Sequence, residues 1–167
     1  MDLKKFLKGK KILIVDDEPD ILEALVELLD TARIDTASSF QEGKQFMEDQ
    51  NYDIAILDIM GVKGFELLNI ANEQKIPALM LTAHALSEES LKKSAEEGAA
   101  YFAPKDKMHE IEIFVADVLE ALEKKKSPWE KWFARLGGFY DKRFHGSNWR
   151  EQEREFWENK IKRHPLI

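Results

Sequence analysis

The sequence contains no cysteine, so a disulfide framework and a thiolate metal site are both excluded. It also lacks any apolar stretch near the roughly 20 residues needed to span a bilayer. Residues 1–11 are basic, but their four apolar residues are scattered rather than gathered in a run, which is unlike a signal peptide. These absences predict a soluble, cytoplasmic protein with no membrane partner.

A strong positive charge is missing as well. The 167 residues carry a net charge of −7, and their composition suits one globular domain with an appendage. From Ser127 onwards nine Lys and Arg face six Asp and Glu, a net of +3, which leaves −10 for residues 1–126. The acidic part argues against nonspecific DNA binding, and the rest is too weakly basic to argue for it.

Short apolar runs alternate with amphipathic stretches along the chain. The runs are "KILIV" (11–15), "DIAILD" (53–58), "ALML" (78–81), "AYFA" (100–103) and, more weakly, "RIDTA" (33–37). Runs of this length are typical of strands buried on both faces. The stretches between them have helical spacing, and the clearest stripe is Ile111, Phe114, Val115, Val118 and Leu122. Five strand–helix alternations predict an α/β fold, a doubly wound parallel sheet with helices on both faces.

Polar side chains stand where the predicted strands end. Asp16 and Asp17 end the first strand, Asp58 the third and Thr82 the fourth, and Lys105 follows the fifth. Ligands of such sheets bind outside the carboxyl ends of the strands, so these side chains should converge. Three neighbouring carboxylates call for a hard divalent cation, and ligation by oxygen alone suits Mg²⁺. A hydroxyl and an ammonium group beside them are what an incoming phosphoryl group needs.

Residues 10 to about 124 closely resemble the receiver domain of two-component response regulators. The matching pieces are "ILIVDDEPDI", "DIAILDI", "MLTAHA" and "GAAYFAPK". The resemblance implies a flavodoxin-like (βα)5 fold with strand order 2-1-3-4-5, and a histidine kinase or phosphotransfer protein as partner. We expect residues 1–126 to form the receiver domain and residues 127–167 to form a helical C-terminal extension.

The resemblance also implies a role for each site residue. Asp58 matches the aspartate that is phosphorylated. Thr82 matches the switch hydroxyl and Lys105 the lysine that pairs with the phosphoryl group, so both are expected to assist the transfer. Phe102 matches the switch aromatic, although Tyr101 next to it must point to the opposite face and one of the two is simply core.

The implied cofactor is Mg²⁺. Asp17 matches the direct metal ligand, and Asp16 matches the acid that orients the water shell of the metal. Asp58 contributes its carboxylate, and Met60, two residues further on, matches the position that lends a backbone carbonyl. These assignments come from the resemblance and are expectations for this chain.

Two stretches depart from the family pattern. "DIMGVKG" places Gly64 six residues after Asp58 instead of the usual eight and lacks the usual proline, so this loop should be short. "APKD" reverses the usual Lys-Pro order, and we expect the Lys105–Asp106 bond to be trans, because a cis bond without proline costs about 2.5–4 kcal/mol. His84 stands where the family varies a residue that tunes dephosphorylation, but an exposed loop histidine fits equally well.

The last forty residues change in composition and hold all four tryptophans. Ser127 and Pro128 predict a helix start, and Gly137-Gly138 predicts its end. Asn148 predicts the start of a second helix. The expected apolar faces are Trp129, Trp132, Phe133 and Leu136 on the first helix, and Trp149, Phe156, Trp157 and Ile161 on the second. So short a segment rarely builds its own core, so it should pack on the receiver domain, a second copy or a partner.

Three classes of function are compatible with these patterns. The favoured class is a phosphorylation-controlled interaction module that acts through a downstream protein or through self-association. The alternative is a transcription regulator whose extension binds DNA, an idea that Arg135, Lys142 and Arg143 keep open. A Mg²⁺-dependent phosphohydrolase is disfavoured, because such an enzyme resembling the haloacid dehalogenases would need an acid where Met60 stands. We therefore expect no enzyme acting on external substrates.

Overall fold

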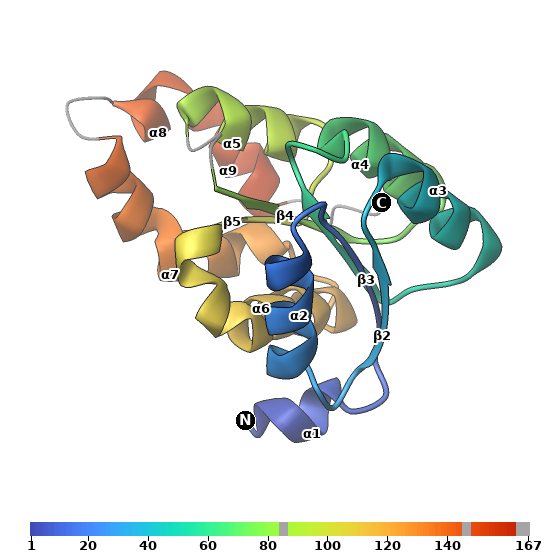
Figure 1. The fold of residues 1–167 in the computed structure, drawn as a ribbon. Helices are drawn as coiled ribbons and strands as arrows, with labels where there is room; N and C mark the ends of the chain where they lie inside the picture. The colour runs from blue at the N-terminus through green and yellow to red at the C-terminus, as the bar shows by residue number, and fades with distance from the viewer. Residues whose placement is uncertain (84–86, 145–147, 163–167) are drawn as a thin grey trace.

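The computed structural model describes residues 1–83, 87–144 and 148–162. Its centre is a five-stranded parallel sheet in the order β2-β1-β3-β4-β5 (Figure 1). The strands are β1 (Lys11–Val15), β2 (Arg33–Ala37), β3 (Ile54–Asp58), β4 (Ala78–Thr82) and β5 (Tyr101–Pro104). Both the strand order and the flavodoxin-like fold class are as predicted from the sequence.

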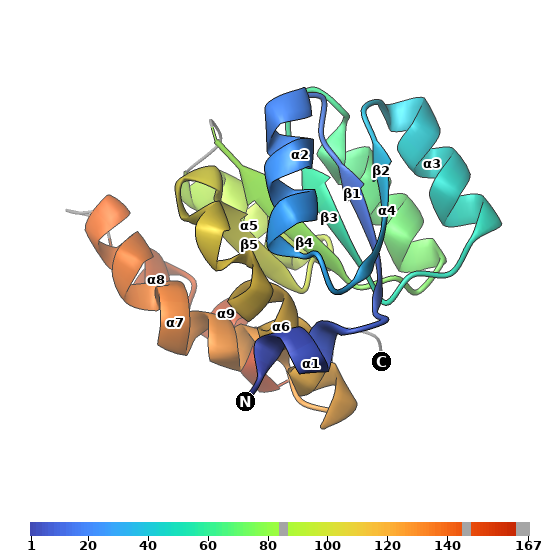
Figure 2. The same ribbon diagram turned by 60° about the horizontal axis from the view of Figure 1, so that its bottom comes forward.

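Helices cover both faces of the sheet (Figure 2). One face carries α2 (Pro19–Leu28) and α6 (Ile111–Glu123), and the other carries α3 (Phe40–Asp49), α4 (Gly64–Glu73) and α5 (Glu88–Glu96). A 3-10 helix, η1 (Lys105–Glu110), joins β5 to α6. A short helix that the sequence did not predict, α1 (Leu3–Leu7), packs on α6. Its Lys4 forms an ion pair with Glu112 of α6 at 3.4 Å and another with Asp30, between α2 and β2, at 2.8 Å.

The local sequence explains where several helices begin. Pro19 occupies the first turn of α2, where its missing N–H is not needed. The Ser39 and Ser87 side chains accept hydrogen bonds from backbone N–H groups of the first turns of α3 and α5. The core follows the apolar runs, because β1, β3, β4 and β5 are almost entirely buried while the weaker run, β2, is partly exposed.

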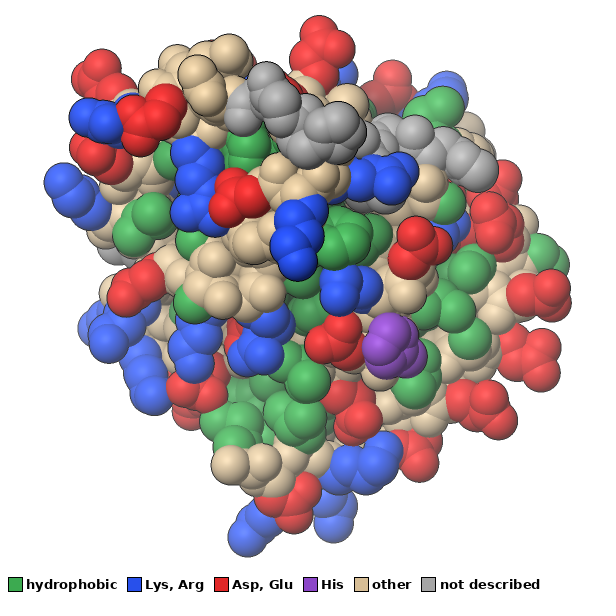
Figure 3. Space-filling model, turned by 90° about the vertical axis from the view of Figure 1, so that its left-hand side faces the viewer, with side chains coloured by type: hydrophobic (Ala, Val, Ile, Leu, Met, Phe, Trp, Pro, Cys, Tyr) green, Lys and Arg blue, Asp and Glu red, His purple; other side chains and the backbone are tan. Residues whose placement is uncertain are grey.

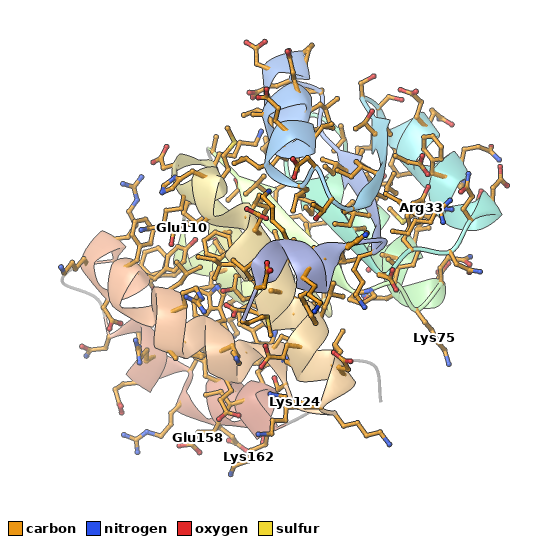
Figure 4. All side chains as sticks on the ribbon, turned by 90° about the horizontal axis from the view of Figure 1, so that it is seen from below. Arg33, Lys75, Glu110, Lys124, Glu158 and Lys162 are labelled. Carbon is orange, nitrogen blue, oxygen red and sulfur yellow. The ribbon has the colours of Figure 1, made fainter. Side chains whose placement is uncertain are left out.

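The C-terminal segment, defined here as residues 127–162, is helical and packs on the rest of the same chain. Its helices are α7 (Pro128–Arg143), α8 (Trp149–Gln152) and α9 (Arg154–Lys162). They lie beside β5, α5 and α6 (Figures 1 and 2). Their aromatic side chains belong to the same apolar core as the sheet. The other face of α9 is polar, and the charged side chains of Glu158 and Lys162 project outward (Figure 4).

Two expectations about this segment were wrong. Gly137-Gly138 does not end the first helix, which continues to Arg143. The side chain of Arg150 fills the space that a Cβ at Gly137 would need, so the glycine permits a close approach within a continuous helix. The expected second helix is divided at Glu153, whose backbone leaves the helical conformation, into α8 and α9.

The outer surface near α7 and α8 is of mixed charge. Lys and Arg side chains alternate there with Asp and Glu, and apolar side chains lie between them (Figure 3). None of the described helices is both long and apolar enough to cross a membrane.

Candidate functional site

The carboxyl ends of the central strands bring the expected polar residues together. Asp16 directly follows β1, Asp58 ends β3 and Thr82 ends β4, and all three are buried, with exposed fractions of 2%, 5% and 0%. Because β1, β3 and β4 are neighbours in register, these ends meet at one edge of the sheet. Lys105 follows β5 at the same edge, at the start of η1.

Lys105 forms ion pairs with the acidic side chains at this edge. Its Nζ lies 2.8 Å from Asp16 Oδ2, 3.3 Å from Asp58 Oδ1 and 3.6 Å from Glu18 Oε1. Burial acts to lower the pKa of Lys105, but the hydrogen bond to Asp16 and the neighbouring negative charges outweigh it and raise the pKa above its ordinary value. The ammonium group therefore stays charged and holds the carboxylates of two strand ends together.

Three consecutive acids form a compact oxygen cluster beside this lysine. The carboxylate oxygens of Asp16, Asp17 and Glu18 lie within 4.8 Å of one another, and the Glu18 backbone N–H donates to Asp16 Oδ1 at 2.9 Å. A cluster of hard oxygen ligands suits Mg²⁺. The metal ligands expected from the sequence did not include Glu18. Its position directly after Asp16 and Asp17 could have suggested that it belongs to the cluster. Asp58 is not part of this close cluster and reaches it through Lys105.

The electrostatics of Asp58 also favour a cation. Burial, followed by the charge of Asp16, raises the pKa of Asp58 to about 6, and the nearby Lys105 only partly opposes this. One ammonium group is therefore not enough to neutralise the carboxylates around it. A divalent cation would supply the missing positive charge, so the residues present fit Mg²⁺.

A cavity of about 160 Å³ opens at this edge, and Asp17, Asp58, Met60, Thr82 and Lys105 are among the residues that line it. Met60 lies at the rim with 57% of its surface exposed. The cavity thus contains both predicted transfer-assisting groups next to the predicted acceptor.

Phe102 lies elsewhere. It is fully buried in β5, and its ring centroid is 5.7 Å from that of Tyr140 on α7. The neighbouring Tyr101 is also fully buried and donates a hydrogen bond from its hydroxyl to Asp117 Oδ2 at 2.8 Å. The two aromatic side chains of β5 therefore both reach groups outside the sheet, and the switch role of Phe102 stays a prediction.

The loop after Asp58 is as short as the sequence predicted. Gly61 has a positive φ of 82°, and a Cβ on it would collide with the carboxylate of Asp17. Gly64 begins α4 so close to the Asp58 carbonyl that a Cβ could not fit there. The Lys105–Asp106 bond is trans, as expected. His84 lies outside the described residues.

Comparison with known proteins agrees with this geometry. Residues 12–116 match the family model of the response regulator receiver domain. The chain belongs to this family. The match ends before α7 begins at Pro128, so the family accounts for the site but not for the C-terminal segment.

Individual response regulators are also similar to this chain in sequence or in fold. The heme response regulator HssR of Staphylococcus aureus (strain JH9) is 44% identical over 82 residues, which cover 46% of this chain and 37% of HssR. TrrA of Thermotoga maritima, whose structure is a complex with Mg(2+)-BeF, is 33% identical with a TM-score of 0.58, covering 66% of this chain and 99% of TrrA. NtrX of Brucella abortus is 27% identical with a TM-score of 0.62, covering 70% of this chain and 28% of NtrX. The chain thus spans little more than a third of HssR.

The raised pKa of Asp58 predicts a pH-dependent stability in the absence of divalent cations. The folded chain holds a proton on Asp58 up to about pH 6, whereas the unfolded carboxyl has a pKa of about 3.9. Between these values the folded state binds more protons, so the free energy of unfolding should fall as the pH rises, by about 1–3 kcal/mol in total. Urea unfolding of the wild type and of an Asp58→Asn variant, both in EDTA and over this pH range, measures the contribution of Asp58 to the pH dependence.

The comparison has a matched control. Asp20→Asn changes an exposed carboxylate in α2 and should keep the wild-type pH profile. Parallel profiles for wild type and Asp58→Asn across this range would contradict the assignment. Added Mg²⁺ should reduce the difference between the two proteins at neutral pH, because the cation stabilises the charged carboxylate.

Proposed function

We propose that this receiver protein is a phosphorylation-controlled response regulator in a two-component phosphorelay. A histidine kinase or phosphotransfer protein donates a phosphoryl group to Asp58, and the change at the site alters a protein-interaction surface. The observation that carries the proposal is the grouping of Asp58, Thr82 and Lys105 around one cavity at the carboxyl edge of the sheet. The membership of residues 12–116 in the receiver family supports it.

The transfer needs a carboxylate nucleophile. An oxygen of ionised Asp58 attacks the phosphorus of the donor phosphohistidine, so a P–O bond forms, the P–N bond breaks and the imidazole leaves with the bonding electrons. Lys105, already 3.3 Å from Asp58 Oδ1, pairs with the phosphoryl oxygens as they arrive. Thr82 lines the same cavity, and its proposed role is to donate a hydrogen bond from its hydroxyl to a phosphoryl oxygen.

Asp16, Asp17 and Asp58 would hold Mg²⁺, with the Met60 carbonyl as a further ligand. When bound, the cation neutralises charge on the transferring group and favours the ionised form of Asp58. The oxygen cluster of Asp16, Asp17 and Glu18 supports this assignment, as does the Mg(2+)-BeF complex of the relative TrrA.

The proposed output is protein interaction, through a downstream partner or self-association, rather than turnover of an external substrate. Met60 stands where a phosphohydrolase of the dehalogenase type would need its second acid. DNA is a poor fit as a partner, because the aromatic faces of the C-terminal segment point inward and its outer surface mixes both charges (Figure 3).

Phosphorylation of Asp58 is directly testable. With Mg²⁺ and acetyl phosphate, we expect the intact mass of the chain to increase by one phosphoryl group, and we expect Asp58→Asn to abolish the increase. An increase that persists in Asp58→Asn would show that the acceptor is another residue. Hydroxylamine, which cleaves acyl phosphates, should remove the added mass.

The metal ligands have a matched pair of variants. Asp17→Asn should weaken Mg²⁺ binding at least about tenfold, because it removes a charged ligand, while Glu18→Gln changes a neighbouring, half-exposed acid and should have a smaller effect. Equal losses in the two variants would contradict the assignment of Asp17 as the direct ligand.

A further inference from the structure

The C-terminal segment is hydrogen-bonded to β5, the strand that ends directly before Lys105. Trp129 donates from Nε1 to the carbonyl oxygen of Ala99, two residues before β5 begins, at 3.0 Å. Trp132 donates from Nε1 to the Phe102 carbonyl within β5 at 2.7 Å. Both indole rings are buried, with exposed fractions of 1% and 0%. Two tryptophans of α7 thus bind the backbone at and before β5.

A second link runs through buried charge. Asp117 on α6 is 4% exposed and accepts the Tyr101 hydroxyl at 2.8 Å. It also accepts two hydrogen bonds from Arg135 on α7, from Nε at 2.6 Å and from Nη2 at 3.1 Å. The side chain of Tyr101 in β5 and the carboxylate of α6 are therefore both tied to the C-terminal segment.

The distance from these links to the phosphorylation site is short along the chain. Phe102 stands three residues before Lys105, within a strand of only four residues. In this structure Lys105 is bonded to Asp16 at 2.8 Å and lies farther from Asp58, at 3.3 Å. A phosphoryl group on Asp58 adds negative charge and acceptor oxygens, which will draw Lys105 away from Asp16. Because Lys105 directly follows Pro104, the last residue of β5, a shift of the lysine toward Asp58 acts on the end of this strand.

The contacts of α7 match the position that β5 takes while Lys105, the residue after it, is paired with Asp16. One of them is also imperfect, because the Tyr140 hydroxyl is buried next to Phe102 without a hydrogen-bond partner among the described residues. An unpaired buried hydroxyl is unfavourable, so this end of α7 holds less firmly than its apolar area suggests. A modest displacement of β5 can therefore shift the balance between docked and released segment.

We propose that docking of the C-terminal segment and phosphorylation of Asp58 oppose each other through β5. The docked segment favours the unphosphorylated site, and phosphorylation loosens α7 from β5 and uncovers the surface around Phe102. This inference rests on the proposed phosphorylation of Asp58. Because such coupling is reciprocal, docking weakens binding at the site by the same factor as binding weakens docking, so a variant with weakened docking should bind more tightly.

The test uses the full chain with Mg²⁺ and beryllofluoride, which mimics a phosphoryl group. Trp132→Phe keeps the aromatic ring but removes the N–H that binds the Phe102 carbonyl. Trp149→Phe is the matched control, because its Nε1 binds Asp141 within the C-terminal segment at 2.9 Å and does not bind β5. We expect Trp132→Phe to bind beryllofluoride about fivefold more tightly or better, and Trp149→Phe to stay within about twofold of wild type.

Amide exchange of the unmodified chain gives a second readout that needs no variant. Beryllofluoride should speed exchange in residues 128–143 as well as changing it near Asp58. If beryllofluoride binds but exchange in α7 and the affinity of Trp132→Phe are both unchanged, the coupling is absent while the proposed phosphorylation stands. Weaker binding of beryllofluoride by Trp132→Phe would mean that docking favours phosphorylation, and that result would overturn the proposed opposition between them. If beryllofluoride does not bind the wild-type chain at all, the proposed function itself fails.

Discussion

A chain truncated after Lys126 should lose about 3–5 kcal/mol of unfolding free energy. The deletion removes the side chains of Trp129, Trp132 and Tyr140, each at most 1% exposed, and leaves the apolar surface around Phe102 in water. Burial of one large aromatic side chain contributes about 1.5–3 kcal/mol, so several of them make a large difference. Urea unfolding of the truncated and full chains measures the loss, and tryptophan emission of the full chain should be that of buried indoles.

The control for this experiment is Glu130→Gln in the full chain. Glu130 is an exposed residue of α7, so this change should stay within about 0.5 kcal/mol of wild type. If truncation leaves stability and oligomeric state unchanged, and the full-length tryptophans emit as solvated indoles, the segment is a free arm. That result would contradict docking within one chain.

Replacing Arg135 with methionine should destabilise the full chain by about 1–3 kcal/mol. Methionine keeps much of the length of the side chain but leaves the Asp117 carboxylate buried, with the Tyr101 hydroxyl as its one remaining partner among the described residues. Removing one member of a fully buried ion pair costs about 3–5 kcal/mol, and the expected value is smaller here because 37% of the Arg135 side chain is exposed. Chemical denaturation measures the difference.

A double-mutant cycle separates the pair from the packing around it. Asp117→Asn combined with Arg135→Met should be more stable than the sum of the single changes predicts, by about 1 kcal/mol or more. Lys124→Met is the matched control, because it breaks an exposed ion pair with Glu120 and should cost less than about 0.5 kcal/mol. Additive single changes would show that Arg135 acts only through its hydrocarbon stem.

The strands of this fold could be predicted from the sequence because they are short and, except for the weaker β2, mainly apolar. "KILIV" and "RIDTA" match β1 and β2 residue for residue, and the other three runs match within one residue at each end. Local patterns failed where packing between distant segments decides the outcome. Gly137-Gly138 has the composition of a helix end, but Arg150 packs against the first glycine and α7 continues.

The site could also be predicted from the sequence, because parallel strands place their carboxyl ends at one edge of the sheet and the polar residues stand at those ends. Glu18 was missed because its position in the acidic cluster depends on how the first turn of α2 folds back over Asp16. The Asp117–Arg135 pair was also missed, because Asp117 lies within the apolar stripe of α6 and its partner is 18 residues away in another helix. Sequence spacing does not reveal such a pairing.

The tryptophans of α7 have another consequence, which concerns solubility. β5 ends the sheet, and a terminal strand offers unpaired backbone groups to any other chain that can align with it. The residues of β5 include no charged side chain that would repel such a neighbour. Its protection comes from Pro104, which has no N–H to donate, and from α7, which reaches the groups around Tyr101 on one side and Phe102 on the other. Variants that release α7 will therefore be prone to strand-to-strand aggregation even where the rest of the sheet remains folded.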